Sequence, residues 1–385
     1  MTAAPSKMVN DRFSLWLAAY YAAFFVAIGL VTPFFPKWLE ARGLDAAAIG
    51  LVLAIPMVVR LAAMPAVAAW ADRHGRLRAA LIGCTFLSAA GYALVGVAQG
   101  VFWIAAALAL ASIVYTPLVP LADAYALKGL RARGGAYGPV RLWGSVTFMI
   151  ANLGGGTMLI LIAPVHLIWP IVASLAVAAL LSLALTPLEA VPAGSAAPAA
   201  QPLLDRRFVT VALAASLIQA SHAIYYGFSI IMWTAEGYGG MAIGALWALG
   251  VLAEIGLFAM SGALPRWIGP AGLLSLGAIG AVLRWGAMAL DPPAALLPVL
   301  QCLHALSYGA THLGAVQFMG QVAPERRGAS AQAYLSVALG AGMALAMSVS
   351  GVLVEQLGAA AYGAMALAAI AGLALVWALP RGATA

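Results

Sequence analysis

Apolar stretches of about 20 residues or more recur along this chain of 385 residues, separated by short polar segments. A helix of that length crosses the hydrocarbon core of a bilayer, which is about 30 Å thick. Only 8% of the residues are charged, whereas an average soluble domain carries about 25%. The chain has too few charged residues to cover itself in water, so the sequence predicts an all-α integral membrane protein.

The apolar stretches predict twelve transmembrane helices, six in each half of the chain. The first six span residues 13–36, 46–70, 78–98, 101–127, 140–163 and 165–186, and the second six span residues 208–235, 241–263, 271–290, 294–321, 329–355 and 358–379. Residues 187–207 are rich in Pro, Ala, Gly and Ser, which is typical of a linker. We therefore expect two pseudo-symmetric six-helix bundles, residues 1–186 and 208–385, joined by a cytoplasmic linker.

The basic residues of the loops agree with this topology if the amino terminus lies inside the cell. On the cytoplasmic side they are Lys7, Arg12, Arg73, Arg76, Arg78, Lys128, Arg131, Arg133, Arg206, Arg207, Arg266, Arg326, Arg327 and Arg381, and on the outside they are Lys37 and Arg42. This asymmetry is the positive-inside pattern. We expect a multi-pass protein of the cell (inner) membrane with both termini in the cytoplasm. Because the basic residues behind the net charge of +7 are dispersed over several loops, we expect them to contact lipid headgroups and not nucleic acid.

The loop between the second and third predicted helices carries a recognisable motif. Its sequence, ADRHGRLR over residues 71–78, resembles the signature loop of the major facilitator superfamily, in which an acidic residue is followed by basic residues around a glycine. The resemblance implies the major facilitator fold and a gating loop formed by Asp72, Arg73, Gly75 and Arg76. Asp72 can cap a neighbouring helix or pair with a basic residue. The alternative is a loop that only sets topology.

Finer motifs resemble the lactose permeases. Residues 33–39 read PFFPKWL, and Asp123 precedes Arg141 by eighteen residues, a spacing at which lactose permeases place a substrate-binding pair. Leu303-His304 and Arg284 also match. The chain departs from that family at Ser307 and Gln301, where lactose permeases have a proton-carrying carboxylate and a lysine.

The details are more similar to the phenylpropionate permease branch, and the resemblance covers nearly the whole chain. It rests on Arg60 and Pro65 before the signature loop, on YGPVRLWGS over residues 137–145, and on the pairs Ala253-Glu254, Arg284-Trp285 and His312-Leu313. This resemblance implies proton-coupled uptake of a small aromatic acid such as 3-phenylpropionate. A sugar or nucleoside proton symporter and a drug or metabolite efflux antiporter stay open as alternatives.

Other classes of function receive no support from the sequence. It has no nucleophile elbow, metal-ligand spacing or phosphate-binding glycine loop, so we expect no enzyme, no catalytic residues, no metal and no cofactor. The proton gradient would be the driving force. We expect a monomer whose partners are a small-molecule substrate, the proton and lipid.

The polar and aromatic residues inside the predicted helices give the candidate substrate site. A charged side chain at the bilayer centre costs about 2.5–3.5 kcal/mol on insertion scales, so such residues usually face a cavity. Arg141 suits a carboxylate because its planar fork can bind both oxygens. The candidate substrate-binding residues are Tyr21, Phe25, Asp123, Arg141, Phe148, Tyr226, His304 and Tyr308. The alternative for Asp123 and Arg141 is a purely structural ion pair.

The second half of the chain holds the candidates for proton coupling, which are Glu254, Arg284, His304 and His312. His304 and His312 share a polar helical stripe with Ser307, Tyr308 and Thr311, and histidine changes charge near neutral pH. A membrane carboxylate such as Glu254 can hold or release a proton according to its surroundings. The alternative is that these groups only hold the helices together by hydrogen bonds.

Overall fold

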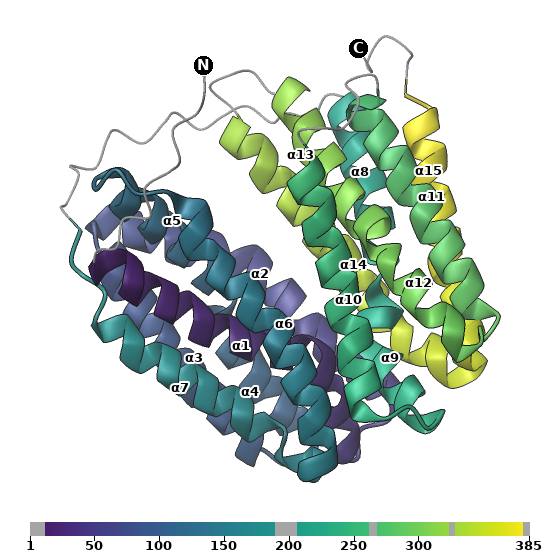
Figure 1. Cartoon of the computed structure of the whole chain (residues 1–385), viewed down its shortest axis with the longest axis horizontal. Coiled ribbons are helices and arrows are strands. Elements are labelled where there is room, and N and C mark those ends of the chain that lie inside the picture. The colour runs from purple at the N-terminus through teal and green to yellow at the C-terminus, as the bar shows by residue number, and fades with distance from the viewer. Residues whose placement is uncertain (1–11, 189–205, 262–267, 323–327, 380–385) are drawn as a thin grey trace. The chain divides into compact units, whose positions relative to one another are not determined.

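The computed structural model describes residues 12–188, 206–261, 268–322 and 328–379, and every regular element in them is a helix (Figure 1). Ten helical stretches of this part of the chain are long and apolar enough to cross a membrane. The all-α membrane fold is thus confirmed, while the number twelve stays a prediction. Residues 189–205 of the linker and the basic residues Lys7, Arg266, Arg326, Arg327 and Arg381 lie outside the described residues.

The chain divides into two compact units. Unit 1 comprises Met1–Gly43 and Val59–Ala196, and unit 2 comprises Leu44–Val58 and Ala197–Ala385. The two halves of one long helix, α2, therefore belong to different units. The predicted boundaries of the six-helix bundles stay a prediction.

Unit 1 is built around its first helix. Its elements are α1 (Arg12–Ala41), α2 (Ala46–His74, shared with unit 2), α3 (Leu77–Val97), α4 (Gly100–Tyr115), α5 (Leu118–Arg131), α6 (Tyr137–Leu161), the 3₁₀ turn η1 (Pro164–His166) and α7 (Ile168–Leu183). Helix α1 packs on α6 and α7, and α3 packs on α4 and α7. The ring of Phe34 lies so close to Gly155 that a Cβ there would be 2.2 Å from it. A glycine thus lets α1 and α6 approach closely, as small residues do in membrane helices.

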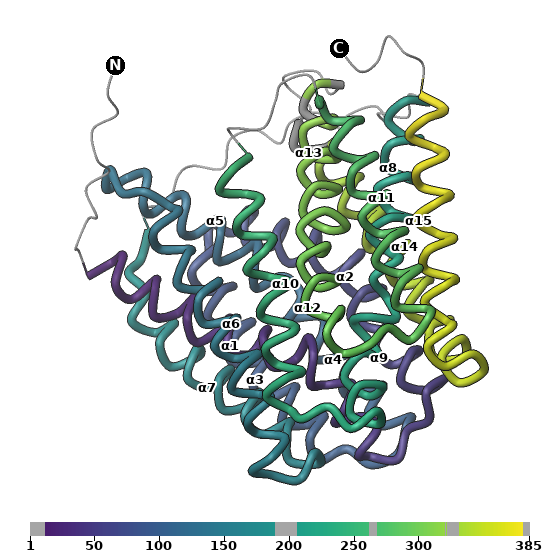
Figure 2. Tube along the Cα trace, turned by 45° about the vertical axis from the view of Figure 1, so that its right-hand side comes forward, coloured from purple at the N-terminus to yellow at the C-terminus, as the bar shows by residue number. Residues whose placement is uncertain are grey.

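Unit 2 has a similar all-helical construction. Its elements are α8 (Arg206–Ala220), α9 (Ala223–Ala235), α10 (Gly240–Met260), α11 (Gly269–Ala289), η4 (Ala294–Leu296), α12 (Leu297–Cys302), the π-helical turn η5 (Ala305–Ala310), α13 (Thr311–Val322), α14 (Gly328–Leu357), η7 (Gly358–Ala361) and α15 (Tyr362–Trp377). Helices α8, α11 and α15 run side by side (Figures 1 and 2). Their buried core includes Phe208, Leu274 and Val376.

Three of the predicted helices are interrupted near their middle. The first breaks at Thr116 and Pro117, because proline has no N–H to continue the ladder. The second breaks at Ser221 and His222, whose side chains bond the carbonyl oxygens of Ile218 and Gln219. Such side-chain bonds compete with the helix backbone. The third contains the π-helical turn η5, a rare form that occurs often at functional sites.

Candidate functional site

A charged cluster in unit 1 is centred on the carboxylate of Asp123. Its Oδ1 accepts hydrogen bonds from the hydroxyls of Tyr21 (2.7 Å) and Tyr137 (2.8 Å), which come from α1 and α6. The same oxygen lies 3.7 Å from Nε of Arg141. The two tyrosines therefore satisfy the carboxylate, and Arg141 adds its charge at a distance longer than a hydrogen bond.

The guanidinium of Arg141 is positioned by aromatic rings. Its Cζ lies 4.0 Å above the ring of Phe25 and 5.4 Å from that of Tyr21. Gly144, one turn along α6, leaves the space for this stack, since a Cβ there would lie 3.0 Å from both Arg141 and Phe25. In the described part of the chain no group accepts a hydrogen bond from this guanidinium. Arg141 is thus a partly exposed cation (25% for its side chain) with donors available to a ligand.

Phe148 lies on the same face of α6 as Arg141, two turns further along. Its side chain is half-buried, and no ring contact connects it to Tyr21 or Phe25 among the described residues. The structure therefore brings together Tyr21, Phe25, Asp123 and Arg141, and among the described residues no ring contact joins Phe148 to this group.

In unit 2 the polar residues form a linear chain of four side chains. Arg284 on α11 is fully buried, and its Nη2 donates to Oε1 of Gln301 at 2.7 Å. Its Nη1 lies 3.0 Å from Nδ1 of His304. The other ring nitrogen of His304, Nε2, lies 3.5 Å from Oε2 of Glu254 on α10. The chain thus runs from Gln301 through Arg284 and His304 to Glu254.

The chemistry of arginine assigns the proton on His304. Arg284 can only donate, so Nδ1 of His304 accepts, and the ring proton lies on Nε2, facing Glu254. A histidine N–H that faces a carboxylate in this way can donate a hydrogen bond to ionised Glu254 and so favour its charged form. Glu254 is the more exposed of the two, with 16% of its side chain accessible. Gly309 in the π-helical turn leaves room for it, since a Cβ there would lie 3.3 Å from Cγ of Glu254.

Aromatic rings surround this line of four side chains. The rings of His304 and Tyr308 stack at 5.3 Å, and those of Tyr308 and His312 stack at 6.3 Å. Tyr226 lies 6.5 Å from His304 between ring centroids. The structure therefore groups all the predicted residues of unit 2, with the exposed His312 at the end of the stack.

Two groups in this region carry contacts that the sequence did not predict. Nε2 of His222 lies 3.0 Å from the hydroxyl of Ser307, which couples α9 to the π-helical turn. Gln301 stands where the lactose permeases have a lysine, and it accepts the hydrogen bond of Arg284 described above.

In unit 1, Tyr137 belongs to a sequence motif but not to the predicted site. The sequence does not reveal these contacts, because it does not show which side chains of neighbouring helices face one another.

The predicted gating loop joins α2 to α3 within unit 1. Gly75 adopts φ +61°, a conformation that favours glycine, and it ends α2 with the bonds from Gly75 N to Asp72 O and from Arg76 N to Ala71 O. Arg73 bonds the carbonyl of Ala69 in its own helix. Asp72 forms no ion pair with any described residue. The loop thus has a defined turn, and its gating role stays a hypothesis.

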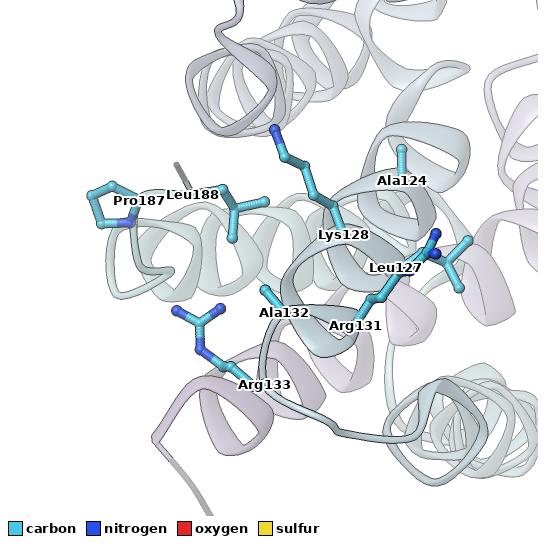
Figure 3. Close-up of a pocket in the computed structure, with 8 residues that line it drawn as sticks. All are labelled: Ala124, Leu127, Lys128, Arg131, Ala132, Arg133, Pro187 and Leu188. Carbon is cyan, nitrogen blue, oxygen red and sulfur yellow. The ribbon is translucent and has the colours of Figure 1, made fainter. Parts of the chain in front are cut away.

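A basic hollow of about 1030 Å³ lies at the carboxyl end of α5 (Figure 3). Its lining includes Lys128, Arg131 and Arg133, together with Pro187 and Leu188 after α7. No acidic residue occurs in the described lining, so the hollow favours anions.

Buried charged groups inside membrane-spanning helices are typical of proteins that move solutes or ions. The family model described as "MFS_1 like family" matches residues 14–363. A protein of Escherichia coli named "Probable 3-phenylpropionic acid transporter" is 32% identical over 371 residues, covering 94% of this chain and 96% of the relative. A "Maltose permease" of Geobacillus stearothermophilus is 31% identical over 352 residues, covering 88% and 86%.

Solved structures share the fold at lower sequence identity. The nucleoside transporter NupG aligns with a TM-score of 0.78 at 17% identity, covering 95% of this chain and 98% of that one. A D-xylose-proton symporter aligns with a TM-score of 0.71 at 13% identity, covering 96% and 98%. The chain belongs to the major facilitator superfamily; it is a secondary transporter of small molecules and not an enzyme.

Proposed function

We propose that this transporter takes up a small organic acid, of the type of 3-phenylpropionate, together with protons. The observation that carries the proposal is the stack of Arg141 on Phe25, with donors of the guanidinium unused. A carboxylate would bind the planar fork of Arg141 in two hydrogen bonds, and an aromatic ring would contact Phe25 and Tyr21. The relative named for 3-phenylpropionic acid supports the same substrate class.

Asp123 and a substrate carboxylate could alternate as the anion beside Arg141. In the absence of substrate it is the acidic neighbour of Arg141, at 3.7 Å, and the hydroxyls of Tyr21 and Tyr137 hold it in place. A substrate carboxylate would replace Asp123 as the counter-ion of Arg141, while the two tyrosine hydroxyls keep Asp123 hydrogen-bonded. Such a site stays satisfied both with and without its ligand, as a carrier requires.

Proton coupling would reside in unit 2. Glu254 is the proposed proton carrier, and Nε2–H of His304 would stabilise its ionised form. The buried Arg284 fixes His304 in the required tautomer. Transport would proceed by alternating access, with twelve helices in two bundles of six, both termini in the cytoplasm and a monomer in the inner membrane. The gating loop of Asp72, Arg73, Gly75 and Arg76 would respond to that change of state.

The maltose permease relative favours a second candidate, proton-coupled sugar uptake. A carboxylate substrate would use both donors of the Arg141 fork, whereas the hydroxyls of a neutral sugar would hydrogen-bond Asp123 and Arg141 together, so the two substrate classes must be compared directly. The test is uptake into proteoliposomes under an imposed inward proton gradient, with labelled 3-phenylpropionate, maltose and a nucleoside compared.

We expect accumulation of the aromatic acid alone, abolished when the gradient is collapsed. Arg141→Lys keeps the charge but loses the fork, so it should lower kcat/KM by about 10–100-fold, the equivalent of about 1.5–3 kcal/mol. Accumulation of maltose instead, with or without an effect of Arg141→Lys, would replace the organic acid by a sugar. Uptake of none of the three by folded protein would direct the search to efflux.

A further inference from the structure

The π-helical turn η5 adjoins both partners of the proposed proton-binding pair. His304 directly precedes the turn, and Glu254 on α10 packs against it, since a Cβ on Gly309 would lie 3.3 Å from Cγ of Glu254. Nε2 of His304 lies 3.5 Å from Oε2 of Glu254. The position of the turn therefore sets the distance and direction of the His304 N–H toward the carboxylate.

His222, at the break between α8 and α9, bonds this turn through a defined tautomer. Its Nδ1 lies 3.1 Å from the carbonyl oxygen of Gln219, which can only accept, so Nδ1 carries the ring proton. Nε2 of the neutral ring is then an acceptor, and the hydroxyl of Ser307, at 3.0 Å, donates to it. The hydroxyl of Thr311, directly after the turn, instead bonds a carbonyl of its own helix. Ser307 thus reaches across to another helix where a hydroxyl commonly stays within its own.

The contact between His222 and Ser307 is the short polar contact of the break with the turn. Both residues are 0% exposed, so bulk solvent does not compete for the bond. The contact from Nε2 of Gln219 to the carbonyl oxygen of Tyr308 is longer, at 3.5 Å. On another side the turn packs against α11, where a Cβ on Gly280 would lie 2.7 Å from a side chain of the turn. His222 therefore holds the turn by a bond, where α11 holds it by packing.

We infer that His222 is a positioning residue for proton binding by Glu254, acting through Ser307 and the π-helical turn. This inference rests on the proposed proton coupling by Glu254. His222 stays neutral in this role, because a proton on its Nε2 would remove the acceptor that Ser307 uses. By holding the turn, His222 keeps the N–H of His304 directed at the carboxylate, which favours the ionised form of Glu254.

The titratable and charged groups around Glu254 and His222 come from α9, α11, α13 and the turn with the residue before it. They are Tyr226, Arg284, His304, Tyr308 and His312. Substitution of His222 or Ser307 leaves all of these groups in place. A change in proton binding by Glu254 would therefore report the position of the turn and not the loss of a neighbouring charge.

The test is the protonation of Glu254 itself, which needs neither substrate nor a gradient. The infrared band of its protonated carboxyl group would be titrated against pH in the purified full-length protein, with Glu254→Gln identifying the band. His222→Leu and Ser307→Ala should each raise the midpoint by about 0.5–1 pH unit, roughly 3–10-fold in proton affinity, because the His304 N–H is less well directed. The double variant should shift the midpoint no further than the larger single shift, since both changes remove one bond.

Ser229→Ala is the matched control, because Ser229 is a buried serine of α9 whose hydroxyl has no hydrogen-bond partner among the described residues. It should leave the midpoint unchanged. His222→Gln offers an acceptor and a donor at similar reach, so it should restore most of the wild-type value. Ser307→Ala removes a single oxygen and tests the same bond if His222→Leu fails to fold.

Proton-driven uptake by the same variants separates this inference from the proposed function. A shifted midpoint in a protein whose uptake ignores the gradient would keep the positioning role of His222 and remove the proposed coupling. An unchanged midpoint in folded Ser307→Ala, or an equal shift in Ser229→Ala, would overturn the inference even where uptake is proton-driven. A Glu254 band that does not titrate in the wild type would overturn it as well.

Discussion

The seam between α11 and the π-helical turn allows a quantitative test of the packing. A Cβ on Gly277 would lie 2.0 Å from Oγ1 of Thr311, 3.0 Å from its backbone N and 3.1 Å from the carbonyl oxygen of Leu306. Thr311 cannot simply rotate away, because its hydroxyl bonds the carbonyl of Ser307 at 2.9 Å. Gly277→Ala must therefore separate the two elements, and overpacking of this kind costs about 1–3 kcal/mol.

Gly286→Ala is the matched control, because it makes the same substitution on the same helix where nothing lies within 4 Å. Alanine is favoured over glycine in a helix interior by about 0.5–1 kcal/mol. Gly286→Ala should thus be neutral or slightly stabilising. Both substitutions gain this helix propensity, so it cancels in the comparison, and the two variants are expected to differ by about 1–3 kcal/mol in the free energy of unfolding, the overpacking cost alone.

The assay is unfolding of the purified protein in detergent micelles, with the midpoints of both variants compared with that of the wild type. Adding Thr311→Ala to Gly277→Ala should recover part of the loss, since the hydroxyl at 2.0 Å is removed while the backbone contacts stay. Equal stability of Gly277→Ala and Gly286→Ala would refute the close packing of this seam. Because the seam carries Arg284 and His304, substrate uptake should fall together with stability.

Three further predictions concern individual side chains. Glu254→Gln should abolish proton-driven accumulation while substrate exchange without a gradient continues, which counterflow assays would measure. Gln301→Leu should lower unfolding free energy by about 1–3 kcal/mol, because the buried Arg284 loses an acceptor at 2.7 Å; a midpoint equal to that of the wild type would contradict this. Partial burial, and then the neighbouring charge of Asp291, raise the pKa of Glu236, so stability should rise as the pH falls through that raised pKa, because the folded state binds the proton more tightly than the unfolded state does. Glu236→Gln should remove this part of the pH profile.

The sequence predicted the membrane helices well because lipid imposes a simple requirement of length and apolarity. It did not predict the interruptions at Pro117, at Ser221 and His222, and at residues 305–310. Hydropathy averages side chains over a window, whereas these breaks depend on single backbone hydrogen bonds. The predicted span 140–163 also starts three residues late, since α6 begins at Tyr137. That small error removed from the predicted helix one of the two tyrosines that bond Asp123.

Parts of the candidate site could be predicted because they depend on local geometry. Asp123 and Arg141 lie on consecutive helices, α5 and α6, so a short connection brings them to 3.7 Å. The sequence shows Gln301 only as a departure from a family lysine, and its bond to Arg284 depends on the packing of α12 against α11.

The irregular backbone of the spans and their polar side chains belong to one physical problem. Inside lipid, a backbone group released from a helix must find a partner in the protein or in a water-filled cavity. At Ser221 and His222 the partners are side chains that also reach inward, with Ser221 accepting from Trp285 Nε1 and His222 contacting Ser307. Directly after the π-helical turn, Thr311 bonds the carbonyl of Ser307 within it. The polar groups at these two breaks also lie beside the buried cluster, since Ser221 bonds Trp285, the neighbour of Arg284 in sequence, and the ring of His222 lies 5.5 Å from that of His304. A straight apolar helix at either place would be simpler to insert, but it would lack these contacts. At these two breaks, the irregular backbone and the buried polar side chains therefore occur together within the membrane-spanning helices.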